Sequence, residues 1–354
     1  MDQYPTIETV VNDARSRIEV RKAEIDEARK RRAAIVAALR KEFVGSRHYV
    51  NGSIAHGDAL TPLTDVDLGL VISNDDGVYG PGKKGPGELQ ERAASAIRRE
   101  LASEYGDLRV EFRDRKRSIL VRFRDPIRKG LPDFTADVIT AIDYPGGRGL
   151  YIPRFNAWDR SDPETHTSLV TGANARTESV YARTVRLLKH WNRQNGQPLC
   201  SWNIKALALY CVNSEDALVS SMRDWFHYAI DELRIGETED PARVADKPIK
   251  LNASQTEVVK KLEDASRKLE KAITYDLAGY PALAQKELAD LFNDPEMLPA
   301  PSRDAVLREG VRLHSAPHGK PSKAFGAPLL VTSAAPGAAA APAAASTPVR
   351  SWGQ

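Results

Sequence analysis

The stretch GSIAHGD at residues 52–58, followed by DVDLGLVI at residues 65–72, decides the fold of this chain. The first segment opens with a Gly-Ser pair and is typical of a turn that begins a helix. The second is an apolar strand that begins with Asp65 and Asp67. Because residues i and i+2 of a strand point to the same face of a sheet, we expect the two carboxylates to project together.

A third acidic residue lies far downstream in a second strand-like segment. Asp137 stands inside the run FTADVI at residues 134–139, where an unpaired charge among apolar residues would be costly. Like charges close together favour a neutralising cation, and hard carboxylate oxygens favour Mg²⁺ or Mn²⁺. A site for two such ions needs a third carboxylate, for which Asp137 is the first choice. The alternatives are Glu111, Asp133 and Asp143.

The Gly-Ser pair supplies chemistry that complements the acids. Gly52 allows the backbone to approach a phosphate closely, and Ser53 offers a hydroxyl and an N–H at a helix N-terminus, where anions bind. By itself the pair also fits an ordinary turn and helix cap, and an Asp-x-Asp pattern is common. Three acidic residues on strands, beside a Gly-Ser pair that can bind phosphate, together predict nucleotidyl transfer on two divalent metal ions.

Composition limits the class of protein. The chain has 354 residues, 28% of them charged, and a formal net charge of +3; this length allows two lobes, and this charge is only weakly suited to a polyanionic partner. No apolar run approaches the roughly 18 residues of a membrane span, and the N-terminus lacks signal-peptide features. Two cysteines, Cys200 and Cys211, are too few for a disulfide framework or a four-cysteine zinc site. We therefore expect a cytoplasmic protein.

The chain divides into three parts by pattern. Residues 1–150 predict a mixed-sheet α+β lobe led by one long helix over residues 6–43. Residues 151–312 predict a helical lobe that begins with an irregular connection ending near Asp162. Residues 313–354 are rich in alanine and proline, and the prolines break any alanine helix, so we expect a disordered tail.

A basic run, RKRR at residues 29–32, lies within the expected long helix. A run of this kind is typical of a solvated helix face. It also fits a surface for nucleic acid or phosphate, although no aromatic residues are interleaved with it to form a platform for single strands. The sequence leaves both interpretations open.

The sequence also resembles a known superfamily. Gly52-Ser53, an eleven-residue interval, Asp65-Val66-Asp67 and a later strand acid resemble the signature of the polymerase-β-like nucleotidyltransferases. Further segments are similar to the bacterial cGAS/DncV-like nucleotidyltransferases, the CD-NTases: YIP at 151–153, Trp158, DP at 162–163, RLLKHWN at 186–192 and SW at 201–202. The resemblance spans roughly residues 45–235.

The resemblance implies a fold and an activity. The implied fold is the bilobed polymerase-β-like nucleotidyltransferase fold, with a mixed-sheet catalytic lobe, a long N-terminal spine helix and a helical lobe. The implied activity is the joining of NTPs, ATP among them, into a cyclic di- or trinucleotide second messenger for antiphage (CBASS) signalling, with release of pyrophosphate. The implied partners are a downstream effector, reached through the cyclic product, and a ubiquitin-transfer-like enzyme that acts on the C-terminal tail. No zinc insertion is visible, so direct sensing of double-stranded DNA is not expected.

The resemblance also assigns roles to the residues of the opening motif. Gly52 and Ser53 would hold the donor triphosphate. Asp65 and Asp67 would bind both metal ions, Mg²⁺ or Mn²⁺. Asp137 would bind the catalytic ion and help to deprotonate the acceptor hydroxyl.

Three residues of the helical lobe receive roles in the same way. Lys189 resembles the helix lysine that reaches the phosphates, Ser201 the hydroxyl beside them, and Trp202 the aromatic residue that stacks on a base. The alternatives are a solvated helix lysine and a core tryptophan. Asp58 departs from the pattern, because many relatives carry a small or hydroxyl residue there, and it adds negative charge near the phosphates.

Two other functions remain open at this point. One is a linear nucleotidyltransferase that acts on RNA ends or on a small acceptor, which the basic run at residues 29–32 would favour. The other is a catalytically inactive nucleotide-binding protein. Three intact acids argue against it.

Overall fold

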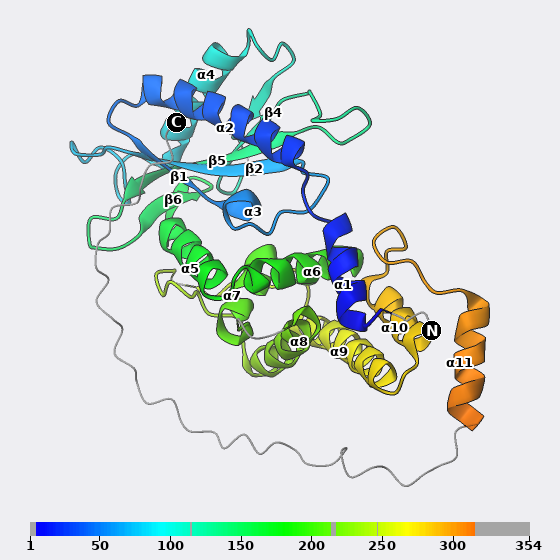
Figure 1. Ribbon diagram of the computed structural model, residues 1–354. Helices are drawn as coiled ribbons and strands as arrows, with labels where there is room; N and C mark the ends of the chain where they lie inside the picture. Colours follow the sequence, from blue (N-terminus) through cyan, green and yellow to red (C-terminus); the bar gives the residue numbers. More distant parts are fainter. Residues whose placement is uncertain (1–4, 114, 214–216, 246, 316–354) are drawn as a thin grey trace. The chain divides into compact units, whose positions relative to one another are not determined.

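The structure is a computed structural model that describes residues 5–113, 115–213, 217–245 and 247–315 (Figure 1). The chain forms two compact units, Met1–Gly310 and Val311–Gln354. Within the first unit, a lobe built on a β-sheet and a lobe built from helices each have a large apolar core of their own.

The sheet lobe contains a seven-stranded mixed sheet. Its strands are β1 (Arg47–Val50), β2 (Asp65–Ile72), β3 (Arg109–Glu111), β4 (Ile119–Arg122), β5 (Thr135–Asp143), β6 (Leu150–Arg154) and β7 (Ala157–Ser161). The order is β1-β2-β5-β4-β3, with β6 paired to β5 and β7 paired to β6. β2 and β5 are parallel and the other pairs are antiparallel. The two strands that carry the predicted acids are therefore neighbours.

Two helices, α2 (Lys22–Glu42) and α4 (Pro86–Leu101), pack against each other and against the sheet (Figure 1). Each presents an apolar stripe to the sheet, as a helix that covers one face does. The buried residues of these stripes include Ala28, Ile35, Leu39, Leu89, Ala93 and Ile97.

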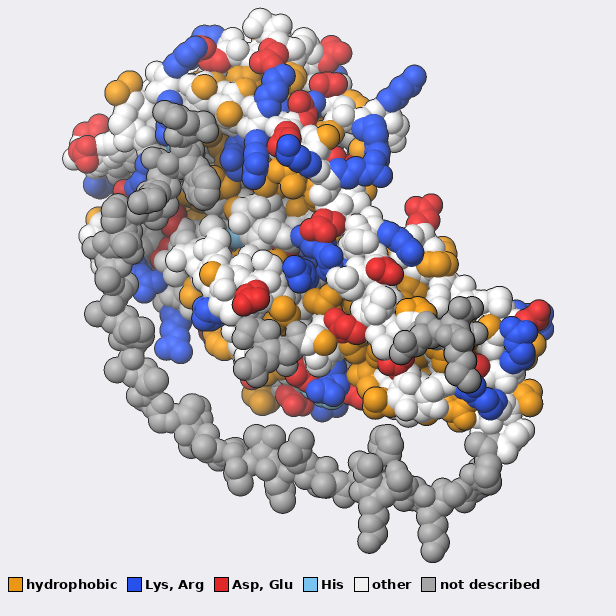
Figure 2. Space-filling view, in the orientation of Figure 1, with side chains coloured by type: hydrophobic (Ala, Val, Ile, Leu, Met, Phe, Trp, Pro, Cys, Tyr) orange, Lys and Arg blue, Asp and Glu red, His pale blue; other side chains and the backbone are white. Residues whose placement is uncertain are grey.

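The basic run of α2 is divided between core and surface. Arg31 is only 2% exposed, and its guanidinium lies 4.9 Å and 5.0 Å from the ring centres of Phe123 and Phe134, where cation–π attraction helps to hold it. Arg29 is exposed and Arg32 is half-buried, and neither has an acidic partner among the residues described. Basic and acidic side chains are interspersed over the face shown in Figure 2.

The long helix predicted over residues 6–43 is two helices. α1 (Ile7–Arg17) precedes α2, and between them Glu19 forms an isolated β-bridge with Leu60. α1 belongs to the core of the helical lobe, whereas α2 belongs to the core of the sheet lobe. The break thus follows from burial in two different cores, and the intervening segment holds neither proline nor glycine.

The helical lobe is built from α1 and six further helices. These are α5 (Pro163–Arg176), α6 (Val180–Gln194), α7 (Ser201–Cys211), α8 (Leu218–Ile235), α9 (Gln255–Leu277) and α10 (Pro281–Phe292). Two tryptophans, Trp191 on α6 and Trp225 on α8, lie at its centre with 1% and 0% exposure. The β6–β7 hairpin replaces the irregular connection expected up to Asp162, and α5 is a helix that the sequence pattern did not predict.

The last described helix is α11 (Arg303–Ser315). Apart from residues 313–315, the expected tail at 313–354 lies outside the described residues. We propose the division of the chain at residues 150 and 312 that the sequence suggests. In the part of the chain that the structure describes, no helix combines the length and the apolar character needed to cross a membrane.

Candidate active site

The parallel pairing of β2 with β5 places two of the predicted acids opposite each other. In its register Asp67 is the partner of Asp137, and Asp65 is the partner of Thr135. Asp65 and Asp67 lie two residues apart on β2 and so point to the same face. The structure therefore brings all three carboxylates together at the beginning of these two strands.

The charges of these acids act on one another. Burial, followed by the charges of Asp65 and Asp137, raises the pKa of Asp67 to about 6. Burial and then the charge of Asp137 raise the pKa of Asp65 as well. Burial is the larger cause of both shifts and repulsion between the carboxylates adds to it; a bound cation would oppose both effects.

The alternative third acids lie elsewhere. Glu111 pairs with Arg122 at the far side of the sheet, and Asp143 at the other end of β5 pairs with Arg47. Asp133 precedes β5, and both its carboxylate oxygens are buried without a hydrogen-bond partner among the described residues; the structure offers no reason for this. It is Asp137, and not these three, whose charge acts on Asp65 and Asp67.

Asp137 already has two partners. The Ser118 hydroxyl donates to its Oδ1 at 2.5 Å, and the Arg115 guanidinium donates to the same oxygen at 3.2 Å. Neither partner was predicted from the sequence. Arg115 supplies a positive charge at the place where the resemblance expects a metal ion.

Gly52 is required by the shape of the site. It begins α3 (Gly52–Ala55), and its φ of +81° lies in the region that favours glycine. A Cβ atom on Gly52 would lie 1.9 Å from Oδ2 of Asp67. The backbone therefore runs directly against the acid cluster, with the half-buried Ser53 next to it. Since α3 is a single turn, the resources for an anion at this place are local N–H groups and the Ser53 hydroxyl more than a helix dipole.

Asp58 explains the position of Lys189. Asp58 is 0% exposed, and the Lys189 ammonium donates to its Oδ1 at 2.7 Å and to its carbonyl at 3.0 Å. The ammonium of Lys205, on α7, lies 2.9 Å from its other carboxylate oxygen, Oδ2. Lys189 is thus neither a solvated surface lysine nor free. Lys205 was not singled out from the sequence, although its spacing of four from Ser201 puts both on one side of α7.

The segment after α3 is held by the helical lobe. Arg186 on α6 donates to the carbonyls of Gly57 at 2.6 Å and Ala59 at 3.1 Å. Asn174 on α5 donates to the carbonyl of His56 at 2.9 Å. These contacts hold the helical lobe against the loop that follows the Gly-Ser pair. Because this loop precedes the strand that carries Asp65 and Asp67, the lysines of the helical lobe and the acids are assigned to one candidate site.

Ser201 and Trp202 begin α7. Ser201 is exposed, and Trp202 is half-buried. The ring centre of Trp202 lies 4.4 Å from that of His166 and 6.5 Å from that of His56. His56 in turn accepts a hydrogen bond from Lys205 at 2.8 Å. Trp202 thus packs against the core of the helical lobe and lies near His56, which contacts Lys205.

The carboxylate oxygens of the three acids suit a hard divalent cation, but they are not already arranged to hold one. In residues 5–113, 115–213, 217–245 and 247–315, no three Asp, Glu, His or Cys side chains are arranged to hold a metal ion. Asp65 and Asp67 share a face and carry raised pKa values, whereas Asp137 is turned to Arg115 and Ser118. Oxygen donors of this kind suit Mg²⁺ or Mn²⁺, so the residues present fit the expected group.

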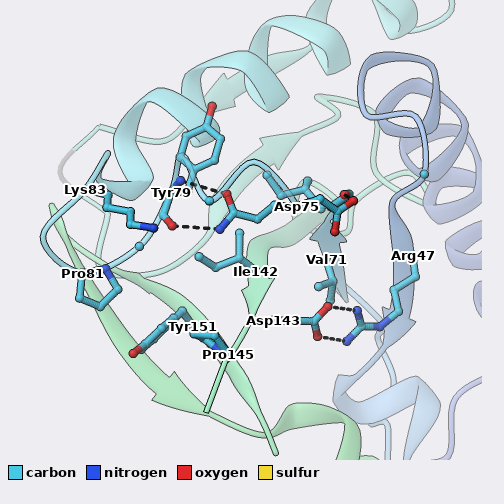
Figure 3. A pocket seen from close by; sticks show the side chains of 16 residues that line it. Arg47, Val71, Asp75, Tyr79, Pro81, Lys83, Ile142, Asp143, Pro145 and Tyr151 are labelled. Carbon is cyan, nitrogen blue, oxygen red and sulfur yellow. Dashed lines mark hydrogen bonds and ion pairs between the residues drawn. The ribbon is translucent and has the colours of Figure 1, made fainter. Parts of the chain in front are cut away.

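A separate cavity of about 620 Å³ lies at the other end of the same strands (Figure 3). It is lined by the ends of β2 and β5, and the Arg47–Asp143 ion pair forms part of its wall, with both N–O distances at 2.7 Å. At ~3.3 Å per residue, Val71 in its wall lies roughly 20 Å along β2 from Asp65. This cavity is not part of the acid site.

Comparison with solved structures identifies the fold, although no protein-family model and no functionally curated protein match the sequence. CdnC of E. coli MS115-1 with ATP superimposes with a TM-score of 0.61 over 82% of this chain and 99% of that one, at 16% identity. The Bradyrhizobium diazoefficiens CD-NTase CdnG in complex with GTP gives 0.60 over 86% and 99%, at 15% identity. The chain has the fold of the cGAS/DncV-like nucleotidyltransferases.

A third CD-NTase structure is similar to this chain, over a smaller share of its own length. Vibrio cholerae DncV, a cyclic AMP-GMP synthase in complex with a linear intermediate, matches with a TM-score of 0.55 over 84% of this chain and 81% of that one, at 16% identity. The predicted fold class, an α+β bilobed fold with a mixed sheet and a helical lobe, is confirmed. At these identities the likeness to the CD-NTases concerns the fold.

Proposed function

We propose that the chain is a metal-dependent nucleotidyltransferase that joins NTPs into a cyclic di- or trinucleotide and releases pyrophosphate. The observation that carries the proposal is the in-register pair of Asp67 and Asp137, with Asp65 on the same face and Gly52 against Asp67. Three carboxylates beside a glycine turn suit the transfer of a nucleotidyl group on two metal ions. The CD-NTase fold supports this choice over other metal-dependent chemistry.

In this proposal Asp65, Asp67 and Asp137 hold two Mg²⁺ or Mn²⁺ ions. When bound, the ions supply the charge that stabilises the transferring phosphate and lowers the pKa of the attacking hydroxyl. The protein orients the donor: the backbone at Gly52 and the hydroxyl of Ser53 bind its phosphates. The raised pKa of Asp67, to about 6, is relieved by any cation that neutralises the cluster.

The helical lobe contributes the opposite wall. Lys189 and Lys205 carry positive charge close enough to lower the pKa of Asp67, which supports a role for both in binding the phosphates. Ser201 stands one helical turn before Lys205 and offers its exposed hydroxyl. Trp202 provides the aromatic face on which a base stacks. In this proposal these four residues and the acids bind the NTP from opposite sides.

The wider role follows from the product. A cyclic oligonucleotide made in the cytoplasm acts at a distance, so the partner of this chain is a downstream effector that binds the product in antiphage (CBASS) signalling. A ubiquitin-transfer-like enzyme that acts on the C-terminal tail remains part of the proposal, although the tail lies outside the described residues.

The test is product formation from purified full-length protein. All four radiolabelled NTPs are incubated with Mg²⁺ or Mn²⁺ and then treated with phosphatase. We expect a phosphatase-resistant product that disappears in D65N/D67N and in D137N. The matched control is D143N, the same change on β5 at the end remote from the cluster, which should retain the product. A product that is entirely phosphatase-sensitive would contradict cyclisation.

A second candidate function is linear transfer to RNA. The observation that favours it is the pair Arg29 and Arg32, which have no acidic partner among the described residues. The same experiment with added RNA distinguishes the two functions. Transfer to RNA would be favoured if RNA ends become labelled only when the three acids are intact and no phosphatase-resistant small product forms. Nucleotide binding with no turnover in any condition would favour an inactive binding protein.

A further inference from the structure

Asp58 is buried at the junction of the two lobes and yet carries no role in the proposed chemistry. It lies in the loop after α3 and is 0% exposed. Two ammonium groups from different helices meet its carboxylate, that of Lys189 on α6 at 2.7 Å and that of Lys205 on α7 at 2.9 Å. A fully buried acid with two buried lysines is costly to assemble unless the charges are paired.

The charges of the three residues depend on one another. Burial would raise the pKa of Asp58, but the charges of Lys205 and Lys189 outweigh it and lower that pKa to about 2. Burial lowers the pKa of Lys205, and the carboxylate of Asp58 opposes this effect. Without Asp58, two ammonium groups would face each other in a buried space, and such a group loses its proton or its position.

His56 completes the arrangement as a neutral acceptor. Burial and then the charge of Lys205 lower the pKa of His56 to about 3. Its Nδ1 therefore accepts from Lys205 at 2.8 Å, and its Nε2 faces the Thr167 hydroxyl at 3.2 Å. Asp58, Lys189 and Lys205 together carry one net positive charge, and it lies next to three carboxylates.

Neither ammonium uses all of its donors within the described part of the chain. A lysine ammonium has three N–H donors. Lys189 directs two of them to the side chain and the carbonyl of Asp58. Lys205 donates to His56 at 2.8 Å, and its ammonium forms an ion pair with Oδ2 of Asp58 at 2.9 Å that is not a hydrogen bond. Within the described part of the chain at least one N–H on each lysine therefore has no hydrogen-bond acceptor.

We propose that Asp58 is a positioning residue that holds Lys189 and Lys205 for the triphosphate of the nucleotide. The proposal rests on the proposed function, since it names how that site binds the phosphate tail of its substrate. Asp58 itself is too deeply buried to touch the nucleotide. It acts through the two lysines, holding both ammonium groups in position and opposing the loss of the Lys205 proton.

The test compares triphosphate with monophosphate binding. Affinities of non-hydrolysable ATP and GTP analogues and of AMP and GMP are measured by calorimetry on the full-length chain. For D58N we expect the triphosphate-to-monophosphate affinity ratio to fall by about tenfold, because one charge-assisted contact to phosphate is lost. In turnover assays KM for NTP should rise more than kcat falls. The matched control is E24Q, a buried carboxylate that contacts Thr61 in the same loop but no lysine; its ratio should equal that of the parent.

A double-mutant cycle keeps the test independent of folding. D58N leaves two buried lysines without a counter-charge, so D58N/K205M, which removes one of them, is measured beside K205M. If Asp58 acts through the lysines, the two changes are not additive in the affinity ratio. Additive effects, or an unchanged ratio in D58N, would overturn the positioning role. A parent protein that does not prefer triphosphates would instead overturn the proposed function, and this inference with it.

Discussion

Asp67 on β2 and Asp137 on β5 face each other in register across a parallel strand pair. Antiparallel strands surround this pair on both sides, so it is the only place in the described sheet where two strands begin together. Gly52 leaves no side chain in the space against Asp67. The acid cluster is therefore a product of topology as well as of sequence, and its excess negative charge leads to measurable consequences.

The first prediction concerns stability and pH. The pKa of Asp67 is raised to about 6 in the folded chain, from 3.8. Between these values the folded chain binds more protons than the unfolded chain, so the free energy of unfolding falls as the pH rises through this window. We expect D67N, which carries no charge, to melt at a higher temperature than the parent at neutral pH and at nearly the same temperature near pH 4. Calorimetric melting across this range, with D143N as the control, checks it; a lower melting temperature for D67N at neutral pH would refute it.

The second prediction concerns metal ions. Because a ligand that binds only the folded state raises the melting temperature, Mn²⁺ should stabilise the metal-free protein. The effect should be larger above the pKa of Asp67 than below it, since protons and cations compete for the same carboxylates. Thermal melting with and without Mn²⁺ at two pH values measures this. D65N/D67N should lose the stabilisation, and an equal shift in that variant would show that the ion binds elsewhere.

The acid cluster could be predicted from the sequence because it depends on local spacing. Two acids two residues apart in a strand share a face, and a glycine before a serine marks a turn. Lys205 could not be found in this way, and Asp58 had no explanation, because each is accounted for only by a contact between the lobes. The spacing of four between Ser201 and Lys205 was the one signal that the sequence offered.

For the helices, too, local sequence patterns could be predicted, and effects of burial and of contacts distant in the sequence could not. The long helix over residues 6–43 has a continuous helical pattern, and only its burial in two separate cores reveals the break near Glu19. α5 was missed because its sequence, rich in threonine and interrupted by a glycine, has a weak apolar periodicity. Its start was nevertheless marked: Asp162 accepts a hydrogen bond from the Thr165 N–H at 2.9 Å as a helix cap, and Pro163 follows in the first turn.

The third prediction uses two glycines with nearly the same backbone. Gly52 and Gly82 have φ values of +81° and +74°, but a Cβ on Gly52 would meet Asp67 and a Cβ on Gly82 would meet nothing within 4 Å. Both G52A and G82A should lose roughly 1 kcal/mol of stability from backbone strain. Only G52A should also lose activity and Mn²⁺ binding, because it displaces the Asp67 carboxylate. Product formation and melting of both variants check this, and an active G52A would show that the close approach is not needed.

The fourth prediction concerns the Arg115 side chain, which forms an ion pair with Asp137. Arg115 and Ser118 both donate to Oδ1 of Asp137, so a metal ion must compete with the guanidinium for this carboxylate. Removal of a neighbouring positive charge makes a carboxylate a better ligand for another cation, and we expect R115M to bind Mn²⁺ roughly tenfold more tightly than the parent. The contact is half-exposed, so the change in folding stability should be small.

Arg117 provides the matched control for this prediction. It lies two residues further along the chain and pairs with Asp159 at 3.1 Å, away from the acid cluster. R117M should therefore leave Mn²⁺ affinity unchanged, since it removes the same charge from the same segment without touching Asp137. Calorimetric titration of Mn²⁺ into the two variants shows whether Arg115 competes with the ion for Asp137 or orients Asp137 for it. If R115M binds Mn²⁺ more weakly than the parent, Arg115 orients Asp137 for the ion instead of competing with it, and the carboxylate must accept both cations at once.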